Sequence, residues 1–130
     1  MVRAATVGVF VVDDHDQFVA VLETILAGEA DFDVVGRASN GEEAIDAVAR
    51  LAPDVVLMDI SMPVLDGFEA TRRIRAEHPN TSVIILTGSD SEEDRAEARA
   101  AGAFGYVTKE RVLDELPDVI RSAAEDARLS

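Results

Sequence analysis

The sequence predicts a single domain of the α/β class, a doubly wound five-stranded parallel sheet with helices on both faces. Short, continuous apolar runs recur along the chain, as expected for strands that are covered on both sides in a parallel sheet. Segments with an apolar stripe at helical spacing separate these runs. Such an alternation requires right-handed crossovers and places the binding site at the carboxyl edge of the sheet.

The apolar runs themselves are the expected strands. In chain order they cover residues 7–12, 33–35 together with 38, 55–58, 83–86 and 104–107. Aliphatic residues dominate these runs, in a chain that is 48% hydrophobic but only 5% aromatic. The core is therefore expected to consist of Val, Ile, Leu and Ala.

The first three helices have recognisable starts, stripes or stops. The first ends near Gly28, and its inner face is a stripe of Phe18, Leu22, Ile25 and Leu26. The second begins at Asn40, with Glu43 three residues on, which resembles a capping box. The third runs from Asp66-Gly67 to His78-Pro79.

The last two helices are less regular. The fourth, about residues 91 to 101, offers only alanines such as Ala96 and Ala100 to the core, so it is expected to be weakly held. Pro117 would break the interior of the fifth helix. We therefore expect Asp114 as the N-cap, with Pro117 in the first turn, where no intrahelical N–H donor is needed.

Length and composition limit the class of protein. A chain of 130 residues with no internal repeat or linker is expected to form one domain, residues 1–130. Without cysteine it has neither disulfides nor thiolate metal sites. No secretory signal or stretch long enough to span a membrane is recognisable, so a cytoplasmic location without membrane association is expected.

The charge balance argues against direct nucleic-acid binding and singles out one cation. The formal net charge is −14, which would repel phosphates rather than neutralise them. Lysine and arginine together number 12, of which Lys109 is the single lysine. Its place directly after an expected strand favours a specific role over an ordinary surface charge.

Polar residues follow the expected strands at the edge where a site is predicted. They are Asp13, Asp14, Asp59, Thr87 and Lys109. Two carboxylates ~5 Å apart repel each other by about 3 kcal/mol at an effective dielectric constant near 20, so three together require a cation. Oxygen ligands favour Mg²⁺, or Mn²⁺, over zinc.

One carboxylate of this group remains available for chemistry. It can act as a nucleophile toward phosphorus and form an acyl phosphate. Phosphoryl transfer depends mainly on neutralising charge on the moving oxygens. A metal ion, the Lys109 ammonium and the Thr87 hydroxyl would supply that from three sides.

Four motifs in this order resemble the response-regulator receiver domain of two-component signalling. They are Val11-Val12-Asp13-Asp14-His15, Val56 to Pro63 with Asp66-Gly67, Leu86-Thr87-Gly88, and Gly105-Tyr106-Val107-Thr108-Lys109. The resemblance implies a flavodoxin-like (βα)5 three-layer sandwich with strand order 2-1-3-4-5. Residues 32–36 and 38–44 further resemble the LuxR/NarL-type subgroup, which usually carries a helix-turn-helix output domain.

The resemblance also implies a role for each site residue. Asp59 would be both the phosphoacceptor and a metal ligand. Asp14 would be the principal metal ligand, Asp13 a ligand mainly through water, and the Ser61 backbone carbonyl a further ligand. Thr87 would bind the phosphoryl group and Lys109 would pair with it. Tyr106 would be the rotating switch residue, although a core aromatic is the alternative. His15 is expected to be a solvent-facing loop residue.

Two positions depart from the family pattern. Glu110 follows the lysine where most receivers have a proline after a cis bond, so either a strained bond or another loop path is expected. Pro117 lies where the subgroup usually continues its helix. The start of the fifth helix, and any dimer face that uses it, therefore departs from the pattern.

The function indicated by these residues is a phosphoacceptor receiver that takes a phosphoryl group from a histidine onto Asp59. Its partner would be a sensor histidine kinase or phosphotransfer protein, with homodimerisation on phosphorylation, and any DNA-binding output domain would lie outside this chain. One alternative is a pseudo-receiver that signals without phosphorylation. Another is a small Mg²⁺-dependent aspartyl phosphohydrolase, although such enzymes usually separate their two aspartates by one residue.

Overall fold

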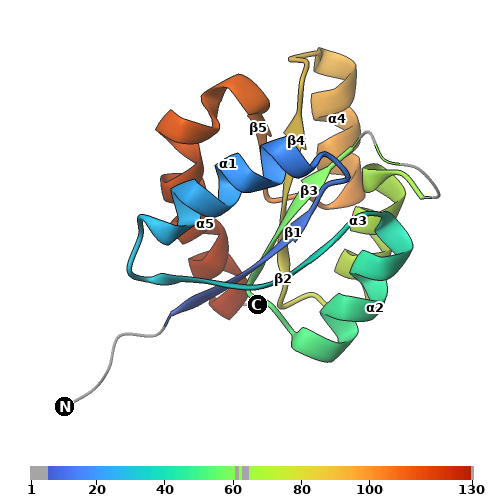
Figure 1. Ribbon diagram of the computed structural model, residues 1–130. Coiled ribbons are helices and arrows are strands. Elements are labelled where there is room, and N and C mark those ends of the chain that lie inside the picture. Colours follow the sequence, from blue (N-terminus) through green and yellow to red (C-terminus); the bar gives the residue numbers. More distant parts are fainter. Residues whose placement is uncertain (1–5, 61, 63–64, 130) are drawn as a thin grey trace.

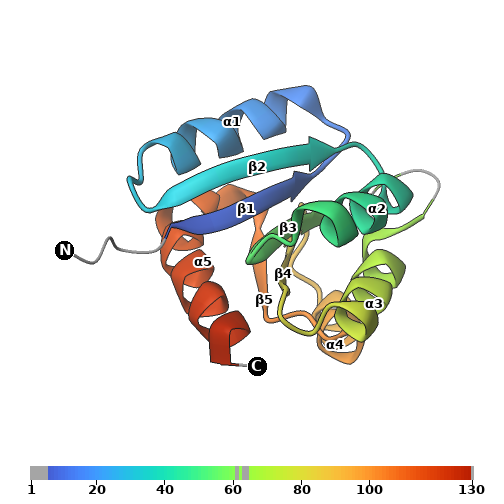
Figure 2. The same cartoon turned by 90° about the horizontal axis from the view of Figure 1, so that it is seen from below.

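The computed structural model describes residues 6–60, 62 and 65–129 and shows a parallel sheet between two layers of helices. Helices α1 and α5 cover one face of the sheet, and α2, α3 and α4 cover the other (Figures 1 and 2). The three-layer α/β sandwich predicted from the sequence is confirmed.

The sheet has five strands. They are β1 (Val7–Val12), β2 (Phe32–Ala38), β3 (Val55–Asp59), β4 (Ser82–Thr87) and β5 (Gly105–Thr108). All neighbouring pairs are parallel, and the order across the sheet is β2-β1-β3-β4-β5, as expected. The last strand begins one residue later than predicted and leaves Phe104 largely exposed before it.

In the described part of the chain, five helices connect and follow the strands. They are α1 (Asp16–Ala27), α2 (Gly41–Leu51), α3 (Gly67–Glu77), α4 (Glu92–Ala101) and α5 (Val112–Leu129). Among the described residues no helix is long and apolar enough to cross a membrane.

The core is divided by the sheet into two apolar clusters. The cluster under α1 and α5 includes Val9 and Leu57, whereas the cluster under α2, α3 and α4 includes Phe10 and Met58. Successive strand residues therefore point to opposite faces and both are buried. This two-sided burial explains why the central strands are continuous apolar runs in the sequence.

Local signals fix the starts of α2 and α3. The Asn40 side chain accepts a hydrogen bond from the backbone N–H of Glu43, and the Glu43 carboxylate accepts one from the backbone N–H of Ser39. This arrangement is close to the predicted capping box. The Asp66 side chain caps α3 in the same way, on the backbone N–H of Glu69.

The predicted start of the fifth helix is wrong. Helix α5 begins at Val112 rather than after an Asp114 N-cap, because a 3₁₀ turn, Lys109–Arg111, leads directly into it. Pro117 therefore lies inside the helix. Its missing N–H removes the donor that the carbonyl of Leu113 would otherwise find four residues on in the helix.

At Glu110 the sequence left two alternatives, a strained cis bond or another loop path, and the chain takes the second. No cis peptide bond occurs in the described part of the chain, and the 3₁₀ turn is the alternative loop path. The turn keeps Lys109 at the end of β5 and joins the site to α5 without an intervening loop.

The fourth helix buries alanines, as predicted, but not the expected ones. Ala98 and Ala101 are buried, whereas Ala96 and Ala100 face solvent. Alanines recur so densely in this segment that the sequence did not define which side of the helix faces the sheet. Helix α4 still buries little apolar area, which is the property on which the expectation of weak packing depended.

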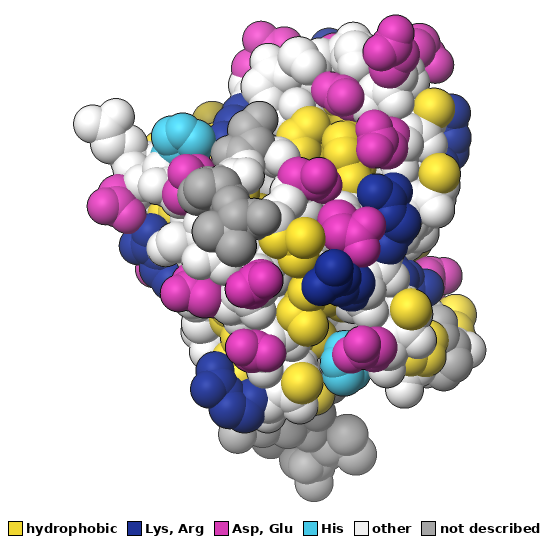
Figure 3. Space-filling view, turned by 90° about the vertical axis from the view of Figure 1, so that its right-hand side faces the viewer, with side chains coloured by type: hydrophobic (Ala, Val, Ile, Leu, Met, Phe, Trp, Pro, Cys, Tyr) yellow, Lys and Arg dark blue, Asp and Glu magenta, His cyan; other side chains and the backbone are white. Residues whose placement is uncertain are grey.

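On the face formed by α2, α3 and α4, acidic side chains are spread out rather than gathered at one point (Figure 3). Figure 3 shows the face formed by α2, α3 and α4, where acidic side chains are interspersed with arginines and small apolar areas. This face has the charge pattern of an ordinary solvent-exposed surface. It does not have the basic stripe that a nucleic-acid interface requires.

Gly67 is required where the chain returns from β3 to α3. A Cβ atom at this position would overlap the carbonyl oxygen of Asp59 and lie 2.8 Å from the Cα of Ile60. We expect Gly67→Ala to lower the free energy of unfolding by about 1–3 kcal/mol, because backbone must move to admit the methyl group. Urea denaturation monitored by circular dichroism measures this loss.

Gly88→Ala is the matched control, because a Cβ there would meet no atom within 4 Å. Its free energy of unfolding should stay the same or rise by up to about 1 kcal/mol. Equal stability of the two variants would contradict the assigned role of Gly67.

Candidate functional site

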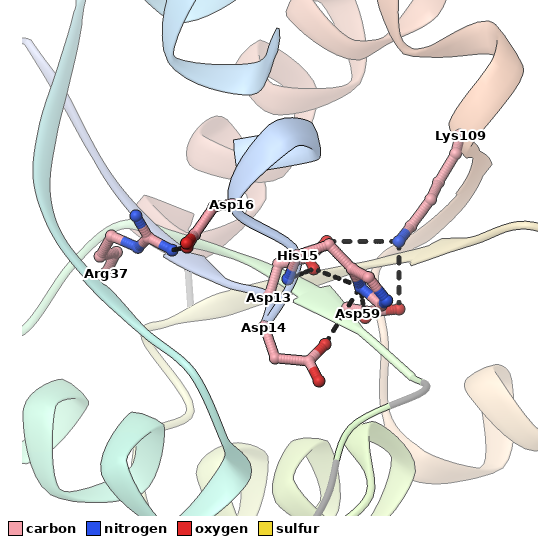
Figure 4. A network of polar contacts seen from close by, with 7 residues as sticks. All are labelled: Asp13, Asp14, His15, Asp16, Arg37, Asp59 and Lys109. Carbon is pink, nitrogen blue, oxygen red and sulfur yellow. Dashed lines mark hydrogen bonds and ion pairs between the residues drawn. The ribbon is translucent and has the colours of Figure 1, made fainter. Parts of the chain in front are cut away.

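Three carboxylates meet at the carboxyl edge of the sheet. Asp59 is the last residue of β3, and Asp13 and Asp14 directly follow β1 (Figure 4). The β1–β3 register pairs Val12 with Met58, so the two strands end side by side. Asp13 and Asp59 are 0% and 1% exposed, whereas the Asp14 side chain is 31% exposed.

Lys109 compensates the two buried carboxylates. Its Nζ lies 3.3 Å from Oδ2 of Asp13 and 3.6 Å from Oδ1 of Asp59. The ammonium also lies 4.5 Å from the centre of the Phe18 ring, a cation–π contact that fixes its approach from the α1 side. The single lysine of the chain therefore lies directly beside the acids at the strand ends.

His15 contacts the same acids from the other side. Its Nδ1 lies 3.1 Å from Oδ1 of Asp13, 3.1 Å from Oδ1 of Asp14 and 3.8 Å from Oδ2 of Asp59. The side chain is 59% exposed, so the expectation of a solvent-facing residue is confirmed. The inward direction of Nδ1 was not predicted, and its only signal in the sequence is the position of His15 next to Asp13-Asp14.

Four groups at this edge can offer ligand atoms to a cation. One atom each of Asp13, Asp14, His15 and Asp59 lies within 4.8 Å of the others. Three of the four donors are carboxylates, which suits Mg²⁺ or Mn²⁺, so the residues fit the predicted metal ion. The predicted ligand carbonyl of Ser61 lies outside the described residues.

Thr87 and Tyr106 lie on the next two strands and share a partner. Thr87, at the end of β4, is buried, and its Oγ1 accepts a hydrogen bond from the backbone N–H of Ser89 at 3.2 Å. Tyr106 in β5 donates its hydroxyl hydrogen to the backbone carbonyl of Ser89 at 2.8 Å. The Ser89 backbone thus joins the two predicted switch residues, a link that no side-chain pattern could reveal.

A second cation holds the outer side of Tyr106. The guanidinium carbon of Arg95 lies 4.6 Å from the ring centre, and Arg95 is itself paired with Asp90 at 2.6 Å. The ring packs against the apolar cluster under α2, α3 and α4 but is only partly buried. Tyr106 is therefore an aromatic at the rim of the core, with its hydroxyl on the β4–α4 loop.

Residues 9–121 match the family model of the response regulator receiver domain. The chain belongs to this family. The match covers every strand end described above, so the acid group, Thr87 and Lys109 all lie in the shared region.

In sequence and structure this receiver is similar to regulators of the LuxR/NarL type. It is 41% identical to the response regulator GacA of Pseudomonas viridiflava over 113 residues, 87% of this chain and 53% of that protein. A LuxR-family two-component response regulator from Aurantimonas sp. SI85-9A1 superposes with a TM-score of 0.88 at 30% identity, over 93% of this chain and 86% of the other.

A third comparison supports the same subgroup. The signal receiver domain of the putative response regulator NarL from Mycobacterium tuberculosis has a TM-score of 0.84 at 26% identity, over 96% of this chain and 98% of the other. The chain spans about half the length of the curated relatives that it matches first, 50% and 53%.

Tyr106 is the single tyrosine of the chain, so its ionisation can be followed directly. Burial raises the pKa of its hydroxyl above the ordinary value of 10.0. We expect the tyrosinate absorbance of the folded protein to appear at higher pH than that of the same chain unfolded in guanidinium chloride. The protonated hydroxyl then stabilises the fold fully below the unfolded pKa, and this contribution is lost as the pH rises through the folded pKa.

The unfolded chain is the control, with an expected midpoint of about 10. A folded midpoint at or below that of the unfolded chain would contradict the burial of the hydroxyl against the β4–α4 loop.

Proposed function

We propose that this receiver accepts a phosphoryl group on Asp59 from a phosphohistidine. The observation that carries the proposal is the position of the Asp59 carboxylate, buried at the end of β3 between Lys109 and the group of Asp13, Asp14 and His15. Repulsion disfavours a buried carboxylate among other acids. Its position here therefore favours a reaction in which nearby cations neutralise the charge over a purely structural role.

In the proposed reaction an oxygen of Asp59 attacks phosphorus while the bond from phosphorus to the histidine nitrogen breaks. The electron pair of that bond goes to the leaving imidazole. Lys109, 3.6 Å from Oδ1 of Asp59, can shift its ammonium from the carboxylate to the transferred phosphoryl oxygens. Thr87, one residue beyond the position that pairs with Asp59 across β3 and β4, can donate its hydroxyl to the same group.

A divalent metal ion belongs to the proposal. Asp14 is the principal ligand because its side chain is partly open to solvent. Asp13 is already engaged, with Oδ1 accepting the backbone N–H of His15 and Oδ2 accepting from Lys109, which supports binding mainly through water. Asp59 and the Ser61 carbonyl complete the proposed ligands. When bound, Mg²⁺ or Mn²⁺ would neutralise charge on the phosphoryl oxygens.

The contacts at Ser89 support a switch toward the face of α4, β5 and α5. If Thr87 turns its hydroxyl to the phosphoryl group, its Oγ1 no longer accepts the Ser89 N–H. Movement of the Ser89 backbone then removes the carbonyl that holds the Tyr106 hydroxyl. Because α4 buries only Ala98 and Ala101, it can follow at small cost.

The partners are those expected for the family. A sensor histidine kinase or phosphotransfer protein would supply the phosphoryl group in the cytoplasm, and phosphorylation would favour a homodimer. This domain would not bind nucleic acid itself. A DNA-binding output domain outside residues 1–130 would carry the response.

Phosphorylation of Asp59 can be tested with a small phosphodonor and Mg²⁺. Intact mass spectrometry should show one added phosphoryl group on the wild type and none on Asp59→Asn, because the amide is not a nucleophile toward phosphorus. Asp16→Asn is the matched control, since this exposed acid pairs with Arg37 near the site but outside the acid group. An adduct on Asp59→Asn equal to the wild type, or none on the wild type, would overturn the assignment.

Metal binding should stabilise the fold because it relieves repulsion among the carboxylates. At a Mg²⁺ concentration about 100 times its Kd, the free energy of unfolding should rise by about 2.7 kcal/mol. Urea denaturation with Mg²⁺ and with EDTA measures the difference, which should largely vanish in Asp14→Asn and persist in Asp16→Asn. An equal rise in Asp14→Asn would place the ion elsewhere.

A further inference from the structure

The His15 side chain contacts the acids at the strand ends rather than its own helix, with Nδ1 at hydrogen-bond distance, 3.1 Å, from Oδ1 of Asp13. His15 is the N-cap residue of α1, but its side chain makes no capping hydrogen bond. The ring instead lies over the carboxyl edge, with Nδ1 directed at the carboxylates (Figure 4). The proposed phosphoryl transfer assigns this imidazole no role.

Lys109 and His15 divide the carboxylate oxygens between them. Lys109 contacts Oδ2 of Asp13 and Oδ1 of Asp59, whereas Nδ1 of His15 lies nearest to Oδ1 of Asp13 and on the Oδ2 side of Asp59. The ammonium therefore leaves the His15 side of the group to a second cation. Asp14, the most exposed of the three acids, adds its Oδ1 on that same side.

The spacing on this side matches adjacent ligands of one metal ion. For metal–ligand bonds of about 2.1 Å, neighbouring corners of an octahedron are about 3.0 Å apart. Nδ1 of His15 lies 3.1 Å from Oδ1 of Asp14, the principal proposed ligand. The two atoms are therefore close enough to be ligands of one ion, and coordination through Nδ1 would replace its hydrogen bond to Asp13.

We propose that His15 is a direct ligand of the metal ion through Nδ1, and that it makes this site prefer Mn²⁺ or other first-row divalent ions to Mg²⁺. The inference rests on the proposed metal site and adds a ligand to it. Mg²⁺ takes oxygen ligands and keeps its waters, so it gains little from an imidazole. First-row transition ions bind imidazole nitrogen well, and a mixed set of carboxylates and one imidazole favours them.

Calorimetric titration with Mn²⁺ and with Mg²⁺ tests the preference. In His15→Gln the affinity for Mn²⁺ should fall at least about tenfold, whereas the affinity for Mg²⁺ should change little. His78→Gln is the matched control, because the other histidine of the chain lies at the C-terminus of α3 beside Glu77. Equal losses for both ions would overturn the preference. A gain in Mg²⁺ affinity would show that the ring blocks the site instead of serving it.

Pulsed electron paramagnetic resonance of bound Mn²⁺ tests coordination itself. A nitrogen modulation from a directly bound imidazole should appear in the wild type and His78→Gln, and it should be missing in His15→Gln. Mn²⁺ bound to the wild type without this signal would overturn the role of His15 and leave the metal site of Asp13, Asp14 and Asp59 standing. Failure of both ions to bind the wild type would overturn the metal site as well.

Discussion

The structure depends on two buried carboxylates that share one ammonium. Asp13 and Asp59 are almost completely removed from water, and a buried ionised group costs several kcal/mol unless it is paired. Lys109 reaches both, which requires β5 to end beside β4 and β1 to end beside β3. Asp13 and Asp59 can therefore be buried because the strand order and registers bring Lys109 beside both of them.

The two sides of the site differ in how firmly they are held. The central strands β1, β3 and β4 are apolar on both faces, so they form a rigid base for the acids. The β4–α4 loop depends instead on single polar contacts, from Ser89 to Thr87 and to Tyr106, and on a helix that buries two alanines. A local chemical event can therefore move this side without disturbing the core.

Hydrophobic periodicity and the positions of the strand ends were enough to predict a parallel sheet and the convergence of Asp13, Asp14, Asp59 and Lys109 at its edge, whereas the strand order followed from the resemblance to receiver domains. Continuous apolar runs located the strands, and residues that directly follow such runs, including Asp59 and Lys109, converge in a parallel sheet whatever their side-chain torsions. The predictions that were wrong needed finer information. The Asp114 cap assumed that Pro117 tolerates only a first turn, and a helix stripe made only of alanine does not define its own rotation. The direction of the His15 ring depends on side-chain torsions, which sequence spacing does not encode.

The absence of other lysines gives the site a distinct chemical vulnerability. Reagents or enzymes that acylate ε-amino groups have a single side-chain target in this chain, and it is the cation that compensates Asp13 and Asp59. Acylation would remove that charge and leave two buried acids facing each other. Because the other permanent cationic side chains of this chain are all arginine, acylation of side-chain amines and charge compensation at the proposed phosphoacceptor depend on the same atom, Nζ of Lys109.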